Sequence, residues 1–350
     1  MSNEFEKLGQ RKHDILLSAV DNFIKMECPI TSLNVQESTG AKISTATLRN
    51  ELNALEAMGF LKQIHTSGGR VPTTKAYRYY VSYLINDLTF DSEILQQVRE
   101  KVDRKTSAIT DIVNQVAKIV SETTSYPTVV LMHGFNNLEI ESIKIIPLID
   151  SQMLVLLKTT IGVIKKEITI ESSEEECEKA CEFLSKHFKG KPIGEMLVNI
   201  SKLSSSLKNE MQSFQAVFDY LVLGLSQYTT SSAMKVEGKG VSQMINDLNP
   251  KNFEETKKVI SFVENSNSVK SVLEKESQEE ISFVFGDDDK TLDGCAIIRA
   301  PIKLNGHEIA TLGVIGPERL NYAKVANALK ILSSELSTIN KEKETNNDSN

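Results

Sequence analysis

The chain of 350 residues has no tryptophan, only four cysteines and no long apolar run. Four scattered cysteines do not make a disulfide framework, so we expect free thiols in a reducing cytoplasm. A membrane span needs about 20 consecutive apolar residues, and no run approaches that length, which predicts no membrane segment. The N-terminal residues are polar and charged, a pattern that predicts no secretory signal peptide.

Side-chain sets for catalysis or metal binding are also scarce. Asp287-Asp288-Asp289 is a run of acids in a predicted turn, where such runs are more often solvated than bound to a cation. Cys177 and Cys181 are four residues apart, but no histidine or second cysteine pair completes a metal or redox site. The sequence contains no nucleophile motif and no complete dinucleotide fingerprint. We therefore expect no enzymatic activity, no metal and no cofactor.

Basic charge is relatively concentrated near the N-terminus. Residues 1–85 contain ten Lys and Arg against eight Asp and Glu, whereas the whole chain has a net charge of −7. A net acidic protein does not wrap nucleic acid uniformly. A locally basic module on an acidic body is, however, typical of a DNA-binding head joined to a regulatory or assembly body.

Residues 1–86 predict three short helices, a β-hairpin and a fourth helix. The first helix follows from apolar residues that recur with helical spacing between positions 11 and 26. Ser44 caps the third helix and Gly59 lies at the usual place of a left-handed C-terminal cap. The fourth helix starts at Thr73 or Thr74 and completes a small core. The buried face of the third helix is predicted to be Leu48, Leu52 and Leu55.

The third predicted helix has hydrogen-bonding side chains on its free face. With Leu48 turned to the core, Asn50 and Asn53 point away. Ala46 points the same way and allows close approach to base edges, while Arg49 lies at the flank. Asparagine binds adenine, and arginine guanine, in the major groove. The N-terminal hydroxyl residues, placed to hold a phosphate with the helix dipole, are Ser44, Thr45 and Thr47.

A basic hairpin follows this helix directly. Gly68-Gly69 forms the predicted turn, so the backbone can press against a phosphate or enter the minor groove. For the helix alone, an ordinary solvated face is a serious alternative. A purely structural hairpin does not need basic flanks, so the tandem predicts a winged helix-turn-helix that binds double-stranded DNA. The polar and basic residues around the turn are Lys62, His65, Thr66, Ser67 and Arg70.

The rest of the chain predicts an α/β domain with an insertion. Residues 87–104 are a helical linker, and residues 105–189 contain a helix, four strand-like runs and another helix. Residues 190–277 are mainly helical, apart from one short strand and turn. Strands return in residues 278–340 before a last helix, so the two α/β parts form one interrupted domain. The charged, Asn-rich tail at 341–350 is predicted to be disordered.

These motifs resemble the heat-inducible transcription repressor family HrcA. The resemblance covers nearly the whole chain and is weakest at residues 190–275. One departure is Glu318-Arg319-Leu320, where the family commonly has Thr-Arg-Met, and we expect it to alter local packing and not DNA reading. The matching segments are Ser44–Glu51, Leu55–Leu61, His65–Thr73, Ala76–Val81 and, far away, Thr311–Tyr322.

The resemblance implies both a fold and a function. The implied fold is α+β and multidomain, with a winged helix-turn-helix head and a GAF-like α/β domain interrupted by a mainly helical dimerisation insertion. The implied function is repression of heat-shock chaperone operons by a homodimer on an inverted-repeat operator (CIRCE), with release on heat stress. The family also depends on the GroEL chaperonin to reach its active form, which suggests that marginal folding of the repressor is itself the signal.

Three other interpretations stay open. A small-molecule-responsive regulator would sense a metabolite through the GAF-like body, although no convergent polar set is evident in residues 105–188 or 281–339. An enzyme with an accessory DNA-binding head would need a catalytic constellation, which is missing. A protein-interaction module would use the head to bind a protein, and its DNA binding would be insensitive to salt.

Overall fold

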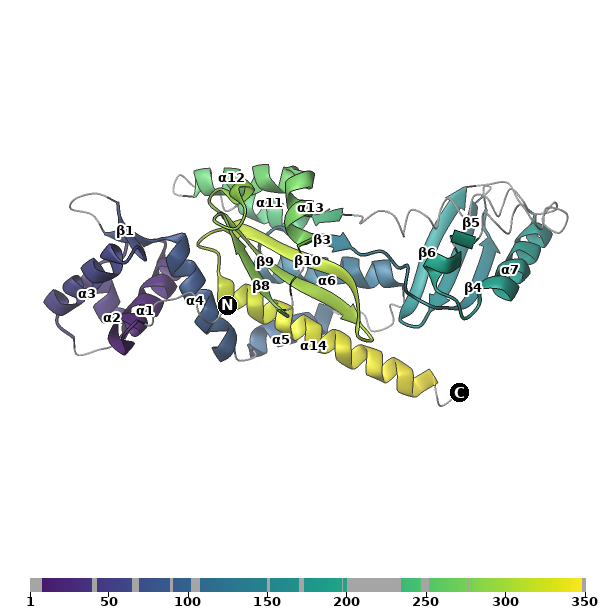
Figure 1. The fold of residues 1–350 in the computed structure, drawn as a ribbon, viewed down its shortest axis with the longest axis horizontal. Helices are drawn as coiled ribbons and strands as arrows, with labels where there is room; N and C mark the ends of the chain where they lie inside the picture. The colour runs from purple at the N-terminus through teal and green to yellow at the C-terminus, as the bar shows by residue number, and fades with distance from the viewer. Residues whose placement is uncertain are drawn as a thin grey trace.

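Runs of helices and runs of strands follow one another along the chain, and Figure 1 shows three parts on the long axis of the molecule. A helical head is followed by a central sheet with helices and then by a smaller lobe. No helix within the described ranges is long and apolar enough to cross a membrane. The computed structural model describes residues 8–39, 43–64, 69–88, 91–101, 108–149, 152–169, 173–196, 198–199, 234–246, 252–275, 277 and 279–347.

The head is built from four helices and a short hairpin. Each helix turns an apolar side inward, and these sides pack into one core. A further helix, α5 (Ser92–Lys101), lies within the predicted linker. The elements of the head are α1 (Gln10–Met26), α2 (Ser32–Thr39), α3 (Thr45–Ala57), β1 (Leu61–Gln63), β2 (Arg70–Pro72) and α4 (Thr74–Asp87).

Helix α3 begins and ends as the sequence predicts. Ser44 Oγ accepts a hydrogen bond from the Thr47 N–H at 3.2 Å, which satisfies one of the free donors of the first turn. Gly59 has a φ of 78°, a left-handed conformation that glycine adopts without steric strain. The predicted cap, C-terminal glycine and buried face are confirmed. The fully buried residues on that face are Leu48, Leu52 and Leu55.

A five-stranded antiparallel sheet forms the centre of the molecule, in the order β7-β3-β10-β9-β8. Successive residues of a strand face opposite sides, so Val129 packs with α12 and α13 while Val130 belongs to the core shared with α6 and α14. Helices thus lie against both faces of the sheet (Figure 1). These elements are α6 (Ile109–Thr124), β3 (Thr128–Met132), β7 (Met234–Glu237), α12 (Phe253–Glu264), α13 (Ser266–Leu273), β8 (Ser282–Phe285), β9 (Cys295–Leu304), β10 (His307–Pro317) and α14 (Tyr322–Asn347).

The lobe has its own three-stranded antiparallel sheet, in the order β4-β5-β6, with α7 packed beside it (Figure 1). It differs from the expectation that all strands of residues 105–189 share one interrupted domain. Only β3 of that range joins the central sheet, because the chain leaves after Met132 and returns with β7 beside β3. The elements of the lobe are β4 (Ile140–Pro147), β5 (Gln152–Thr159), β6 (Gly162–Thr169) and α7 (Glu174–Phe188).

Two helices also differ from the predicted pattern. The residues after β7 were expected to form a turn, but they form α11 (Gly238–Asn246). The segment from Lys341 was expected to be a disordered tail, yet α14 continues to Asn347. Its lysines and glutamates are good helix formers, so they extend a helix that packing has already nucleated.

Candidate nucleic-acid interface

The outer side of α3 is the candidate surface for contact with nucleic acid. Asn50 and Asn53 are exposed there together with Ala46, because the leucines on the opposite side are buried in the head. Arg49 is exposed at the flank of this side. The structure therefore presents one cationic and two amide side chains from a single helical face, a combination suited to base edges in the major groove.

The N-terminus of α3 carries the predicted phosphate-binding hydroxyls. Ser44 and Thr45 are exposed, and Thr47 is half-buried. The Ser44 hydroxyl already caps the helix and lies 2.9 Å from Thr47 Oγ1. The positive end of the helix dipole therefore offers an anion mainly the remaining backbone N–H groups of the first turn.

The hairpin beside α3 is extended by a residue from the α1–α2 connection. Lys62 lies opposite Val71 in the β1–β2 pair, and its side chain is exposed. On the other edge of β2, the backbones of Ile30 and Arg70 exchange two hydrogen bonds of 2.7 and 2.9 Å. The base of the hairpin is therefore held on both sides. The predicted turn residues His65, Thr66, Ser67 and Gly68 lie outside the described residues.

Gly69 has a packing role that does not depend on DNA. A Cβ at this position would lie 2.6 Å from Pro29 Cβ and 2.9 Å from Ile30 O. No side chain fits there unless the backbone moves, because one of these neighbours is itself a backbone atom. The glycine lets the hairpin pack directly against the connection between α1 and α2.

Replacing Gly69 with alanine is expected to lower the free energy of unfolding by about 1–3 kcal/mol through overpacking. Chemical denaturation followed by circular dichroism measures this. Gly9→Ala is the matched control, because no atom lies within 4 Å of the Cβ it would add. Equal denaturation midpoints for the two variants would show that the base of the hairpin can shift to accommodate the added Cβ without loss of stability.

Arg70 is bound within the head. Its Nε donates to Glu56 Oε2 at 2.8 Å, and its Nη2 donates to Asn53 Oδ1. The guanidinium thereby connects β2 to the last turns of α3 and orients the Asn53 amide. Arg70 and Asn53, both predicted as DNA contacts, are thus brought together as a hydrogen-bonded pair in the free protein.

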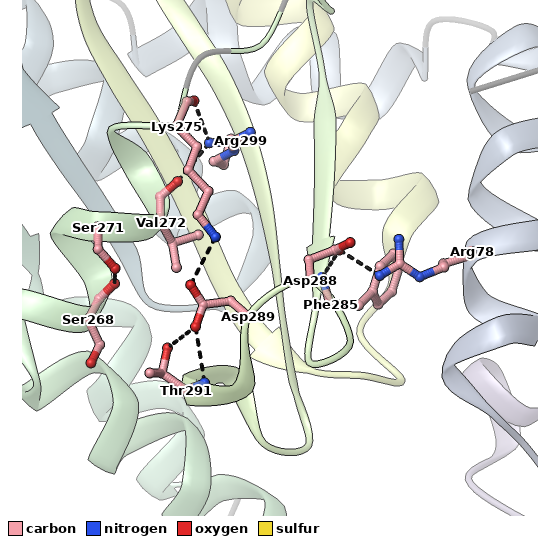
Figure 2. Close-up of polar contacts among 10 residues, drawn as sticks. All are labelled: Arg78, Ser268, Ser271, Val272, Lys275, Phe285, Asp288, Asp289, Thr291 and Arg299. Atoms are coloured by element: carbon pink, nitrogen blue, oxygen red, sulfur yellow. Dashed lines mark hydrogen bonds and ion pairs between the residues drawn. The ribbon is translucent and has the colours of Figure 1, made fainter.

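Two more of the head's cations have intramolecular partners that the sequence did not reveal. Lys75 Nζ donates to Met58 O at 2.9 Å and lies 4.5 Å from the centre of the Phe60 ring. Arg78 pairs with Asp288 of the central domain at 2.7 Å (Figure 2). These side chains stabilise the head and its attachment, so a count of basic residues overstates the charge available to DNA.

The remaining polar side chains of the interface are free to bind a ligand. The described residues provide no partner for the side chains of Arg49, Asn50 or Lys62. The acids of α3 are compensated, since Glu51 lies 3.1 Å from Lys12 Nζ and Glu56 pairs with Arg70. The sequence signal for this compensation is weak, because Lys12 and Glu51 are far apart in the chain.

Comparison with known proteins identifies similar chains. The family model described as "HrcA protein C terminal domain" matches residues 110–326. A protein of Symbiobacterium thermophilum named "Heat-inducible transcription repressor HrcA" is 26% identical over 342 residues, which is 95% of this chain and 99% of that protein. A protein of the same name from Thermoanaerobacter sp. is 28% identical over 340 residues, covering 95% and 97% of the two chains.

A solved structure has the same overall fold. It is titled "Crystal structure of a hypothetical protein at 2.2 A resolution" and superimposes with a TM-score of 0.70 at 18% sequence identity. The match covers 96% of this chain and 99% of the other. At this identity the likeness concerns the fold alone, and it extends over the head, the central domain and the lobe.

Proposed function

The chain belongs to the HrcA family of heat-inducible transcription repressors, and from this we propose that it represses chaperone operons by binding an inverted-repeat operator (CIRCE) as a homodimer in the cytoplasm. It is a non-enzymatic regulator, like the repressors it resembles. Repression then requires only that bound protein occupies the operator, so the central question is how the head reads DNA.

The exposed side of α3 beside the hairpin is the observation that carries this proposal. Asn50 and Arg49 are exposed and without partners among the described residues, and Lys62 stands on the adjoining strand. We assign the head as a winged helix-turn-helix, with α3 in the major groove and the hairpin as the wing. The wing contacts are proposed for the predicted residues His65, Thr66, Ser67, Gly68 and Gly69.

Two-fold symmetry of the operator calls for a two-fold dimer. The residues between β3 and β7 interrupt the central sheet, which fits the expected GAF-like domain with a dimerising insertion. The insertion observed here starts after Met132 and therefore includes β4, β5, β6 and α7. We propose that this insertion, together with the predicted segment 190–277, holds two copies together.

The proposed heat response depends on folding. The GroEL chaperonin assists the repressor to its active form, and heat diverts the chaperonin to other unfolded proteins. Operator occupancy then follows the fraction of repressor that is folded, which changes steeply for a marginally stable protein.

A titration of labelled inverted-repeat duplex against a scrambled duplex tests the proposed function. It is carried out at two salt concentrations and two temperatures, with and without chaperonin. We expect a large preference for the repeat, lost on heating and restored by chaperonin. Equal binding to both duplexes by folded protein would contradict the proposal.

Replacing Lys62 with alanine is expected to weaken binding to all DNA sequences equally. An exposed lysine that contacts a phosphate contributes by releasing a counterion, so its loss lowers the slope of log K against log salt by about 1 per contact. The measurement is the salt dependence of binding to operator and to random duplex. Lys186→Ala, an exposed lysine on α7, is the control and should leave both slopes unchanged. A loss confined to the operator would instead make Lys62 a base-reading residue.

A cavity of about 630 Å³ in the central domain favours a second candidate function, the sensing of a small polar molecule. Ser282, Arg299 and Thr311 come from neighbouring strands and line it together with His133, a polar set that the sequence did not make evident. Arg299 is 7% exposed, and burial lowers its pKa. Its guanidinium donates to backbone carbonyls at 2.7 and 2.8 Å (Figure 2), and no carboxylate among the described residues forms an ion pair with it.

Thermal unfolding of the protein with succinate or benzoate added tests whether the cavity binds an anionic ligand in addition to the proposed binding of operator by the head. A carboxylate that binds the folded state raises the melting temperature, and a sensor would also change its affinity for the operator. Both effects should disappear in Arg299→Lys, which keeps the charge but loses the planar fork. An unchanged melting temperature at high concentrations of both probes would leave Arg299 as a support for the end of α13.

A further inference from the structure

The turn between β10 and α14 contacts the head through Arg319. Arg319 Nη1 lies 2.6 Å from Glu27 Oε1 at the end of α1, and Arg319 Nε lies 2.6 Å from Glu255 Oε2 on α12. The Arg319 side chain is only 14% exposed. One guanidinium fork therefore joins a carboxylate of the head to a carboxylate of the central domain.

The two carboxylates hold this buried charge in place. Burial lowers the pKa of the Arg319 guanidinium, but Glu255 and Glu27 outweigh that effect and the net direction is upward. Removing one partner of such a group leaves an uncompensated charge in a poorly solvated position. A lysine cannot replace the guanidinium, because a single ammonium lacks the planar fork that reaches both acids.

Other contacts of the same junction hold α4. Thr74 Oγ1, on the first residue of α4, donates to Glu318 Oε1 at 3.0 Å. Burial raises the pKa of Glu318. One turn further on, Arg78 pairs with Asp288 at 2.7 Å, and its guanidinium carbon lies 5.0 Å from the centre of the Phe285 ring (Figure 2). The head is therefore held at two places, the end of α1 and the start of α4.

We propose that Arg319 is a positioning residue for operator binding, which sets the orientation of the head relative to the central domain. The proposal rests on the proposed function and deepens it. Figure 1 places α3 at the end of the head that points away from the central sheet, so Arg319 acts on DNA binding through the head and not by contact with DNA.

The consequence for DNA binding comes from the linkage of two heads. A dimer gains affinity when its second head is already held at the second half-site, and it loses that gain when the geometry is no longer fixed. The contact of one head with one half-site does not depend on this orientation. Arg319 should therefore matter for the complete operator and not for an isolated half-site.

The test compares wild type with Arg319→Ala, Arg319→Lys and Glu27→Gln on three duplexes. These are the inverted repeat, a single half-site, and a repeat whose half-sites are moved apart by about five base pairs, half a helical turn. Lys258→Ala is the matched control, because it breaks an ion pair of α12 with Asp293 at 2.9 Å inside the central domain. Circular dichroism and thermal unfolding establish that each variant is folded.

For Arg319→Ala we expect operator affinity to fall about tenfold or more while half-site affinity stays within about twofold of wild type. In this variant, the difference in affinity between the normal repeat and the repeat with added spacing should become smaller. A head that is not held in one orientation can reach half-sites at either spacing. Arg319→Lys and Glu27→Gln should behave like Arg319→Ala, and the double variant Glu27→Gln/Arg319→Ala should be no worse than the single one. Equal losses on operator and half-site, or no loss on either, would overturn the positioning role.

A second readout does not require operator binding. Spin labels on Glu37→Cys of α2 and Lys303→Cys of β9, both exposed, report the distance between head and central domain. The accessible Cys28 and Cys181 are replaced by serine, and labelled chain is refolded with excess unlabelled chain. The distance distribution should broaden in Arg319→Ala but not in Lys258→Ala. If the wild-type protein shows no preference for the operator, the proposed function fails. Separately, a distance distribution in Arg319→Ala that is as narrow as in wild type would overturn the positioning role.

Discussion

Replacing Asn50 with alanine is expected to remove most of the preference for operator over random DNA. The Asn50 amide is exposed on the outer side of α3, and no described residue pairs with it. A bidentate contact between an amide and adenine contributes about 1–3 kcal/mol of base discrimination, so a symmetric dimer should lose about 2–6 kcal/mol. Binding to random duplex should hardly change, because phosphate contacts supply most of that affinity. Arg49→Ala should likewise reduce the preference for operator over random DNA, through the loss of a contact with a guanine.

Competition between operator and random duplex at fixed salt measures this preference. Gln97→Ala is the control, since Gln97 carries an exposed amide on α5 and should leave the preference intact. An Asn50→Ala variant that weakens both duplexes by the same factor would argue against base reading. That result would make Asn50 one more contact to the DNA backbone.

Replacing Tyr322 with alanine should produce the largest loss of stability among single substitutions at the junction. The Tyr322 side chain is fully buried, and its ring centre lies 5.9 Å from Tyr77 of α4 and 6.0 Å from both Phe283 and Phe285 of β8. Its hydroxyl donates to Glu318 O. Truncating a buried aromatic residue costs about 3–5 kcal/mol, and here the cavity would open between the head and the central sheet.

Chemical denaturation of the full chain separates the ring of Tyr322 from its hydroxyl. Tyr322→Phe removes only one hydrogen bond, worth about 0.5–1.5 kcal/mol, so its midpoint should lie close to wild type. Tyr322→Ala should unfold at much lower denaturant and, by loosening the head, should also bind operator less tightly. If the denaturation midpoint of Tyr322→Phe were as low as that of Tyr322→Ala, the hydrogen bond and not aromatic packing would stabilise the junction.

Local features of the head were predictable because they depend on neighbours in sequence. The Ser44 cap and Gly59 obey rules of a few residues, and three leucines at helical spacing identify the buried side of α3. The exposure of Arg49 and Asn50 follows from that side alone. These parts of the candidate site therefore follow from sequence, and the structure agrees with them.

Pairings over long separations were not predictable. The sequence predicts Arg70 as a DNA contact but does not reveal that it binds Glu56 and Asn53. Nor does it reveal that Arg78 pairs with Asp288. Strand periodicity predicts a strand but not its sheet, so the sequence places β4, β5 and β6 in one domain with the later strands although they form a sheet of their own. Tertiary packing decides which elements pair, and a single amino-acid sequence carries little information about that choice.

The insertion between β3 and β7 has a consequence for the order in which the chain folds. Strand β3 pairs with β7 and β10, so it leaves the ribosome long before either neighbour exists. Both hydrogen-bonding edges of β3 are open until β7 is made, and one of them stays open until β10 is made. Closing such distant contacts is slow. The head and the lobe contain mostly local contacts and can fold during synthesis, whereas the central sheet must wait for release of the whole chain. A long-lived, half-closed sheet is a natural chaperonin substrate, which gives the proposed dependence on GroEL a topological origin.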